Sequence, residues 1–136
     1  MKQTHLTILT PYGVFFDDPV PIVTVKTTRG YIGVQAGHTP LVAALDIAQA
    51  SIGLEKSRSH KVLALGGGLM RVDAHGVKIV TPAAEFKDAI DLKRAETARV
   101  DAEKRLREEK LSTSQQIRYT FKLERALNRI KVARGE

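Results

Sequence analysis

The pattern of hydrophobic and polar residues changes once along the chain, near residue 87. Before this point, apolar and polar residues alternate in short runs such as Val23-Thr24-Val25-Lys26. A period of two is typical of strands that bury one face. After it, apolar residues recur every three or four positions, and glycine and proline are absent until Gly135. The pattern therefore predicts an antiparallel β domain over residues 1–86 and a helical domain over residues 87–136.

Eight short runs in the first domain are predicted to form strands. Turn residues separate them, among them Pro11-Tyr12-Gly13 and Gly66-Gly67-Gly68. Many short strands at this spacing favour an antiparallel sandwich or a flattened barrel. The predicted strands cover residues 3–9, 12–16, 20–27, 31–35, 47–55, 60–65, 68–73 and 76–81.

Two helices are predicted in the second domain, over residues 89–110 and 115–133. The expected caps are Asp88 for the first helix and a capping box of Thr113 and Gln116 for the second. Both helices are amphipathic, so we expect them to pair as an antiparallel hairpin. The first helix would use Asp91, Ala95, Ala98, Ala102 and Leu106, and the second Tyr119, Leu123, Ala126, Leu127, Ile130 and Ala133.

The apolar faces of the two helices are narrow and rich in alanine. Burying so little apolar area contributes only a few kcal/mol at about 25 cal/mol per Å², before the entropy of ordering is subtracted. We therefore hypothesise that the hairpin can open and act as a two-state element. A rigid accessory hairpin is the alternative.

The charge of the chain is unevenly distributed. Its formal net charge is +7, and most of the excess lies in residues 111–136. There, four cations at positions i, i+4, i+7 and i+11 share one helical face, with only Glu124 to offset them inside the helix. A solvated face is the simple interpretation, but cations so spaced repel one another and favour an acidic partner. They are Arg118, Lys122, Arg125 and Arg129.

Other chemistry has little support in the sequence. The chain has no cysteine, its four histidines are widely spaced, and no apolar run is long enough to span a bilayer. The triple glycine lacks the lysine of a phosphate-binding loop. No nucleophile motif or catalytic acid pair is present, so we expect no active site and no metal site.

A nucleic-acid-binding module is the alternative that the basic charge suggests. It is disfavoured because the aromatic residues are not interleaved with a basic strand face. These aromatics are Phe15, Phe16, Phe86, Phe121 and the tyrosines.

Several short motifs together resemble one family over nearly the whole chain. They are Leu9-Thr10-Pro11-Tyr12-Gly13, Gly30-Tyr31-Ile32-Gly33 followed by Gly37-His38-Thr39-Pro40, Gly67-Gly68-Leu69-Met70, Ile90-Asp91-Leu92-Lys93-Arg94-Ala95, and Arg125-Ala126-Leu127-Asn128-Arg129-Ile130. Each is weak alone, but their order and spacing resemble the ε subunit of bacterial F-type ATP synthases.

The resemblance implies a β-sandwich of about ten strands followed by a helical hairpin, in a non-catalytic subunit of the central stalk. The implied partners are the γ subunit, the ring of c subunits and, when the hairpin extends, the α/β catalytic head. The subunit would couple proton transport to ATP synthesis and inhibit ATP hydrolysis. Its implied location is peripheral, on the cytoplasmic face of the bacterial cell membrane. No nucleic acid and no required cofactor are expected, and ATP would be a regulatory ligand.

The resemblance also assigns residues to sites. The end facing the c-ring would include Arg29, Tyr31 and His38. Two departures, Tyr31 where glutamate is common and Ala36 where proline is common, would alter polar contacts there.

The hairpin would carry two further sites under the same resemblance. Contact with an acidic loop of the β subunit would use Arg118, Lys122, Arg125 and Arg129. ATP would be bound in the folded hairpin by Glu85, Ile90, Asp91, Arg94, Ala95, Arg125 and Arg129. One departure is Asp101, where ATP-binding relatives often carry arginine, because a carboxylate there would repel phosphate.

Overall fold

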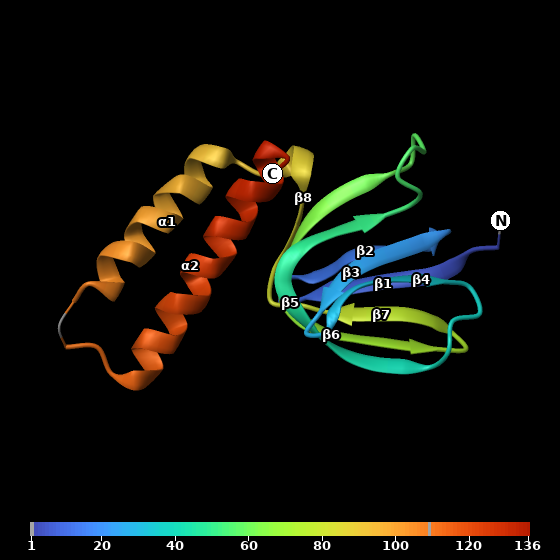
Figure 1. Cartoon of the computed structure of the whole chain (residues 1–136), viewed down its shortest axis with the longest axis horizontal. Coiled ribbons are helices and arrows are strands. Elements are labelled where there is room, and N and C mark those ends of the chain that lie inside the picture. Colours follow the sequence, from blue (N-terminus) through green and yellow to red (C-terminus); the bar gives the residue numbers. More distant parts are fainter. Residues whose placement is uncertain (1, 109) are drawn as a thin grey trace. The chain divides into compact units, whose positions relative to one another are not determined.

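The computed structural model describes residues 2–108 and 110–136, and it separates into two compact units. The sandwich unit is Met1–Phe86 and the hairpin unit is Lys87–Glu136 (Figure 1). The first unit is built from strands and the second from helices, so the expected fold class, a β-sandwich followed by a helical pair, is confirmed.

The sandwich unit contains eight strands in its described residues, where about ten were expected. Their order is β2-β1-β7-β6-β5-β3-β4, with β8 paired to β6. The pairs are antiparallel except β1 with β7, which is parallel. The strands are β1 (Thr4–Thr10), β2 (Gly13–Val20), β3 (Ile22–Thr27), β4 (Gly30–Gln35), β5 (Leu41–Ile52), β6 (Lys61–Asp73), β7 (Gly76–Val80) and β8 (Ala84–Phe86).

The triple glycine lies inside β6 and does not make the predicted turn. Gly67 and Gly68 have φ of 86° and 118°, which lets the long strand bend and continue. A side chain at Gly66 would meet Ala83, and one at Gly68 would overlap the carbonyl of Val80. The glycines therefore allow β6 to bend and to approach neighbouring backbone closely. The two strands predicted over residues 60–65 and 68–73 are therefore the single strand β6. Strand β5 begins at Leu41, before the predicted start at residue 47.

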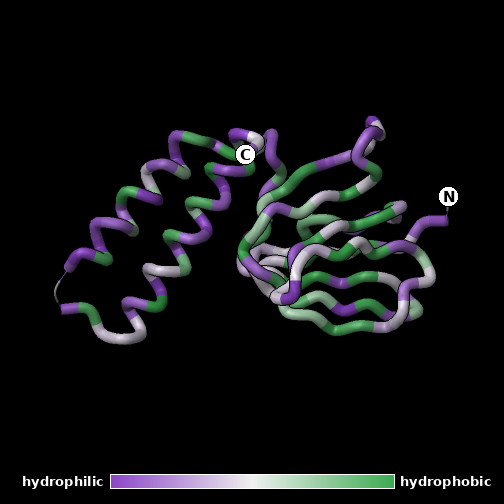
Figure 2. Tube along the Cα trace, in the orientation of Figure 1, coloured by the Kyte–Doolittle hydropathy of each residue, from purple (hydrophilic) through white to green (hydrophobic). Residues whose placement is uncertain are grey.

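The core of the sandwich unit is aliphatic and follows the predicted alternation. On β3, Val23 and Val25 are buried while Lys26 is exposed, and on β7, Val77 and Ile79 are buried. Figure 2 shows hydrophobic and hydrophilic positions intermixed along these strands. The largest side chains that are almost fully buried come from five strands and are Leu6, Ile8, Leu63, Met70, Ile79, Val23, Val25 and Val34. Burial of these side chains stabilises the bent sheet.

The hairpin unit begins with a 3₁₀ turn, η1 (Lys87–Ala89), followed by α1 (Leu92–Leu106). Asp91, and not Asp88, is the N-cap of α1, because η1 takes up the residues that were predicted to start the helix. Asp91 has extended backbone angles, and its carboxylate accepts the Arg94 N–H at 3.1 Å. The helix also ends four residues earlier than predicted.

The second helix, α2 (Thr113–Arg134), begins two residues earlier than predicted. Its capping box uses Ser112 and Gln115, one residue before the predicted pair. Ser112 Oγ accepts the Gln115 N–H at 3.2 Å, and Gln115 Oε1 accepts the Ser112 N–H at 3.0 Å. Gly135 closes the helix with φ of 73° in the left-handed region.

The buried residues of the two helices are mostly small. Ala95 and Ala102 of α1 are buried, as are Ala126 and Ile130 of α2, which agrees with the predicted narrow faces. Leu127 is an exception, because it is 40% exposed. At 100° per residue it is turned away from Ala126, so its inclusion in the apolar face was wrong.

Substituting Gly68 with alanine should destabilise the sandwich unit more than substituting Gly30. Both have similar φ, 118° and 116°, so both variants share the strain of a non-glycine residue. Only at Gly68 would the new Cβ overlap backbone, since nothing lies within 4 Å at Gly30. We expect Gly68→Ala to lower the free energy of unfolding by about 1–3 kcal/mol more than Gly30→Ala, measured by urea titration. Equal losses would contradict a packing role for Gly68.

Candidate functional site

A groove of about 750 Å³ runs along the hairpin unit and receives side chains from both helices. Small residues at the seam form its apolar part, and charged side chains form the rest. The lining residues are Ala98, Asp101, Ala102, Lys104, Arg105, Glu108, Tyr119, Lys122, Arg125, Ala126 and Arg129. The volume lies within the usual range for small-molecule sites. We call this concavity the interhelical groove.

The interhelical groove is electropositive. Cations outnumber carboxylates among its lining residues, and two of the cations lie near one aromatic ring. Arg105 Cζ and Lys122 Nζ are 5.6 and 5.5 Å from the centroid of the Tyr119 ring. Arg125 Nε is buried and has no hydrogen-bond partner in the described part of the chain. A buried donor without an acceptor is costly, so the groove favours an anion with several acceptor oxygens.

Three of the four predicted face cations line this groove. Lys122, Arg125 and Arg129 are among its lining residues, and Arg118 is not. Arg118 lies nearer the start of α2 and is exposed. The helical spacing therefore predicted a shared face correctly, but the groove covers only part of it.

The residues predicted to bind ATP are only partly brought together. Ile90, Asp91 and Arg94 lie at the start of α1 and do not line the groove, whereas Arg125 and Arg129 do. Asp91 is engaged as the helix cap, and the Arg94 side chain is exposed.

Two other members of that predicted set have structural positions of their own. Ala95 is completely buried, which identifies it as a packing residue of the folded hairpin. Glu85 belongs to the sandwich unit, on β8, where it pairs in register with Ala64 of β6.

The α1 side of the groove was predicted only in part, because Ala98, Ala102 and Asp101 were named from the sequence whereas the charged residues Arg105 and Glu108 were not. Asp101, Arg105 and Glu108 recur at i, i+4 and i+7, which places them on one face of the helix. That spacing was a usable signal, but the alternating signs resembled an ordinary solvated helix.

A network of ion pairs beside the seam uses most of the remaining acidic side chains of α1. Arg99 donates to Glu103 at 2.7 Å and to Glu96 at 3.1 Å, and Arg134 of α2 donates to Glu96 at 2.8 Å. The hydrogen bond to Glu103, then that to Glu96, holds the pKa of Arg99 above its usual value. The network joins the end of α2 to α1 and leaves the groove cations without these carboxylates.

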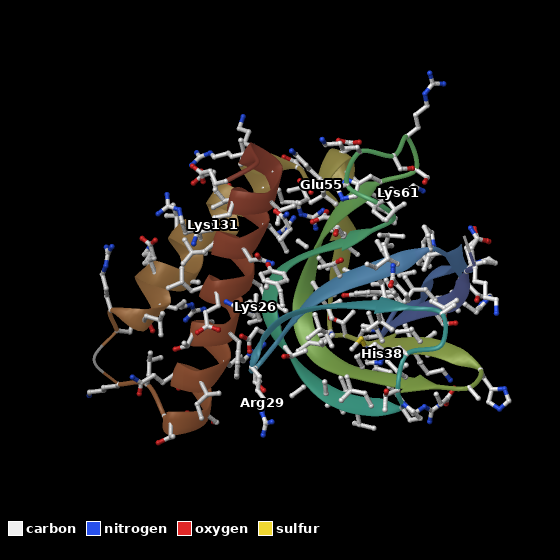
Figure 3. All side chains as sticks on the ribbon, turned by 45° about the vertical axis from the view of Figure 1, so that its right-hand side comes forward. Lys26, Arg29, His38, Glu55, Lys61 and Lys131 are labelled. Carbon is white, nitrogen blue, oxygen red and sulfur yellow. The ribbon has the colours of Figure 1, made fainter. Side chains whose placement is uncertain are left out.

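The residues predicted to face the c-ring do not lie together. Arg29 is in the turn before β4, Tyr31 is in its first half, and His38 follows its far end. The six residues of β4, which lie between Arg29 and His38, span about 20 Å. Figure 3 shows Arg29 and His38 well apart. Tyr31 donates its hydroxyl to the carbonyl of Gln49 at 3.0 Å, and burial raises its pKa. His38 Nδ1 bonds the carbonyl of Thr39 at 2.7 Å.

Other kinds of site find no support in the described residues. No group of three or more histidine, cysteine, aspartate or glutamate side chains there could hold a metal ion. No helix of the described ranges is long and apolar enough to cross a membrane. Phe15 and Phe16 pack against Phe86, with ring centroids 4.8 and 6.4 Å away, so these rings do not form a platform for stacking bases.

Comparison with protein families assigns each unit. Residues 3–87 match the ATP synthase delta/epsilon chain β-sandwich domain, and residues 88–134 match the long α-helix domain of the same chain. The chain belongs to the ATP synthase delta/epsilon chain family. The family predicted by the sequence motifs is therefore confirmed.

Relatives in this family match along nearly their whole length. The ATP synthase epsilon chain of Mycoplasma mobile is 42% identical over 131 residues, covering 96% of this chain and 93% of its own. That of Caldanaerobacter subterraneus subsp. tengcongensis is 40% identical over 133 residues, covering 97% and 94%. A chain of the mitochondrial ATP synthase of Euglena gracilis has the same fold, with a TM-score of 0.74, 24% identity, and coverage of 94% and 79%.

The role of Asp91 as the N-cap of α1 can be tested by comparing two substitutions. Asp91→Ala removes the acceptor of the Arg94 N–H and should destabilise the first turn of α1 by about 1 kcal/mol, whereas Asp91→Asn keeps a good cap. Hydrogen exchange of the α1 amides should therefore accelerate in Asp91→Ala alone. Equal exchange in both variants would show that the cap contributes nothing to α1.

Proposed function

We propose that this chain is the non-catalytic ε subunit of the central stalk of a proton-translocating F-type ATP synthase. The supporting observation is that its two units match the two domains of one family in order, and that epsilon chains about 40% identical align along nearly their full length. The proposed partners are the γ subunit, the c-ring and the α/β head. Such a subunit sits peripherally on the cytoplasmic face of the cell membrane and couples the rotor to the head.

The sandwich unit carries a row of exposed apolar side chains that suits docking to γ. Leu9 of β1 is paired in register with Val14 of β2 and Val80 of β7, and Leu69 of β6 with Val80 and Ala44 of β5. Val14, Leu69 and Val80 are 63%, 57% and 51% exposed. We call these five residues the apolar row. They lie on five adjacent strands and span about 20 Å.

A polar row lies next to the apolar row on the same face. Thr7 is paired with Asp17 and Lys78, and Lys78 with Arg71. Thr7, Lys78 and Arg71 each lie two residues from the apolar row along their strands, and Asp17 lies three residues from Val14 because β2 has an irregularity there. An apolar strip bordered by charges of both signs has the composition of an interface core and rim. Contiguous exposed apolar residues are uncommon on surfaces that bind nothing, which supports a protein partner here.

Replacing Leu69 with aspartate should weaken binding of the γ subunit. A charge in the middle of the apolar row would be desolvated without a partner, so we expect a loss of at least about 2 kcal/mol in binding free energy. Leu54→Asp is the control, because Leu54 is 43% exposed and lies outside the row. Binding would be measured by calorimetry with purified γ, after circular dichroism confirms the fold. Wild-type affinity for Leu69→Asp would exclude this row as the docking surface.

The hairpin unit has a physical basis for leaving its folded arrangement and inhibiting ATP hydrolysis. Helix α2 has 22 residues and α1 has 15, or about 33 and 22 Å, so α1 cannot cover the whole length of α2. Figure 1 shows the start of α2 extending past α1. Ile117 and Phe121, in the first half of α2, are 53% and 47% exposed.

Cations flank these exposed apolar residues. Arg118 and Lys122 follow Ile117 and Phe121 directly along α2. A segment that presents both apolar and basic side chains suits an acidic protein surface with an apolar centre. The proposed inhibitory contact with the β subunit therefore uses Arg118, Lys122, Arg125 and Arg129.

Reversing two of these charges should relieve inhibition. In a reconstituted complex, Arg118→Glu with Lys122→Glu should raise the rate of ATP hydrolysis, because each reversal replaces an attraction by a repulsion, together about 1–2 kcal/mol. Lys110→Glu with Lys131→Glu changes the net charge equally outside the interhelical groove and should leave the rate unchanged. Unchanged inhibition in the first variant would remove the electrostatic part of the proposal.

ATP is the proposed regulatory ligand of the folded hairpin. A ligand that binds the folded arrangement alone stabilises it by its differential affinity and so opposes inhibition. The electropositive groove with Arg125 and Arg129 supports a phosphate-binding role. Within the hairpin unit, the proposed ligand set is Ile90, Asp91, Arg94, Ala95, Arg125 and Arg129.

A further inference from the structure

The two ends of the hairpin unit are held together unequally. The buried residues of α2 are Ala126, Ile130 and Val132, all in the second half of the helix. Residues 113–118, at its start, are all exposed. Packing is therefore concentrated toward the C-terminal end of α2, although the last turn of a chain is usually where order is lost first.

An ion pair between the two helices lies at that same end. Arg134, the last residue of α2, donates a guanidinium N–H to Glu96 Oε1 of α1 at 2.8 Å. Glu96 is oriented by its own helix, because Arg99 Nε donates to its other carboxylate oxygen at 3.1 Å. The acceptor is thus already ordered on α1, which reduces the side-chain entropy lost when Arg134 binds it.

A second cation lies beside the C-terminal end of α2. Lys87 belongs to η1, and a methyl group at Gly135 would lie 3.3 Å from Lys87 Nζ. Gly135 is the left-handed residue that closes α2. The C-terminal end of a helix carries partial negative charge, so an ammonium group beside it is stabilising. Lys87 therefore adds a favourable charge at the end that Arg134 already holds.

The opposite end of the hairpin unit is held more loosely. The capping box of Ser112 and Gln115 bonds α2 to its own first turn and not to α1. Arg105 of α1 lies 5.6 Å from the centroid of the Tyr119 ring, but its guanidinium also pairs with Glu108 at 3.6 Å. The start of α2 can therefore separate from α1 while the end of α2 stays in place.

We propose that Glu96, Arg134 and Lys87 form a latch that keeps the hairpin unit closed at the C-terminal end of α2. We call these three residues the C-terminal latch. The hairpin unit then opens from the start of α2, and the last turn of α2 separates from α1 last. Exposed charged pairs are individually weak, so the latch changes the balance between closed and open hairpins a few-fold and does not fix it.

The C-terminal latch bears on inhibition through the population of open hairpins. The inference rests on the proposed function in taking the open hairpin as the form that inhibits ATP hydrolysis. A contact that exists only in the closed form lowers the population of the open form by its own free energy. The latch therefore opposes inhibition without any ligand, and it weakens as salt screens exposed charges.

Hydrogen exchange of the isolated full chain tests the order of opening. The amides of residues 131–134 should exchange more slowly than those of residues 119–122, the reverse of a helix that frays from the chain terminus. Glu96→Gln should accelerate exchange over residues 131–134 about two- to fivefold and leave residues 119–122 unchanged. Salt at about 1 M should bring the wild type to the level of this variant.

Glu103→Gln is the matched control. Glu103 is also an α1 carboxylate that accepts from Arg99, but its ion pairs, with Arg99 and Arg107, stay on the α1 side. Its loss should leave exchange over residues 131–134 unchanged. Arg134→Gln should match Glu96→Gln, and the double variant should lose no more protection than either alone, because both substitutions remove one interaction.

The outcomes separate the latch from the proposed function. Equal acceleration in Glu96→Gln and Glu103→Gln, or no acceleration in either, would overturn the latch. So would faster exchange over residues 131–134 than over residues 119–122 in the wild type. In a reconstituted complex, Glu96→Gln should strengthen inhibition of ATP hydrolysis by about the factor by which it accelerates exchange. If exchange responds and inhibition does not, the latch stands and the open hairpin is not the inhibiting form.

Discussion

The close approach of α1 and α2 through alanine side chains is the constraint on which the hairpin unit depends. Ala95, Ala102 and Ala126 are buried and bring little apolar area with them. Each buried CH₂ contributes only about 0.8 kcal/mol, so a seam of methyl groups is stabilised far less than one of leucines. Small residues also let the backbones approach, which brings long charged side chains of both helices to one groove. The small side chains at the seam therefore explain both the weak packing of α1 against α2 and the gathering of charged side chains at the groove.

The carboxylates of α1 are distributed unevenly around the hairpin unit. Glu96 and Glu103 are held by Arg99, and Glu96 also by Arg134, so these acids stabilise the hairpin beside the seam. Exposed pairs of this kind contribute little each, but a connected set joins both helices. The groove retains an excess of cations because these carboxylates are engaged elsewhere. The folded hairpin therefore has one side stabilised by ion pairs and another side, the interhelical groove, in which cations outnumber carboxylates.

Much of the fold could be predicted from the sequence because alternation and helical periodicity report burial directly. Val23 and Val25, whose alternation with polar residues predicted a strand with one buried face, are both buried. The prediction of a turn at Gly66-Gly67-Gly68 was wrong. Glycines with positive φ occur in bends inside a strand as well as in hairpin turns, and the sequence alone does not distinguish the two. The helix starts differ from the predicted ones by two and three residues, since several adjacent residues can cap a helix and tertiary context selects among them.

The charged residues of the candidate site were predicted more fully on α2 than on α1. Cations at i, i+4, i+7 and i+11 on α2 define a face by spacing alone, and three of them line the groove. The α1 contribution depends on which side of that helix meets α2, which Ala95 and Ala102 determine and the charges do not. Arg29 and His38 show the same limit, because they are near in sequence yet a strand separates them.

The two units differ in how easily each could exchange its contacts, and this difference explains why regulation would belong to the hairpin. In the sandwich unit, bulky aliphatic side chains such as Leu6, Leu63 and Met70 are fully buried, so opening it would expose large apolar area at once. In the hairpin unit, the buried groups are mostly small, and α2 already presents Ile117 and Phe121 to solvent. A partner that covers these residues and meets the cations gains contacts at little cost in lost packing. The proposed anion in the groove would oppose that exchange, because charge-assisted bonds to both helices would exist only while the hairpin is closed.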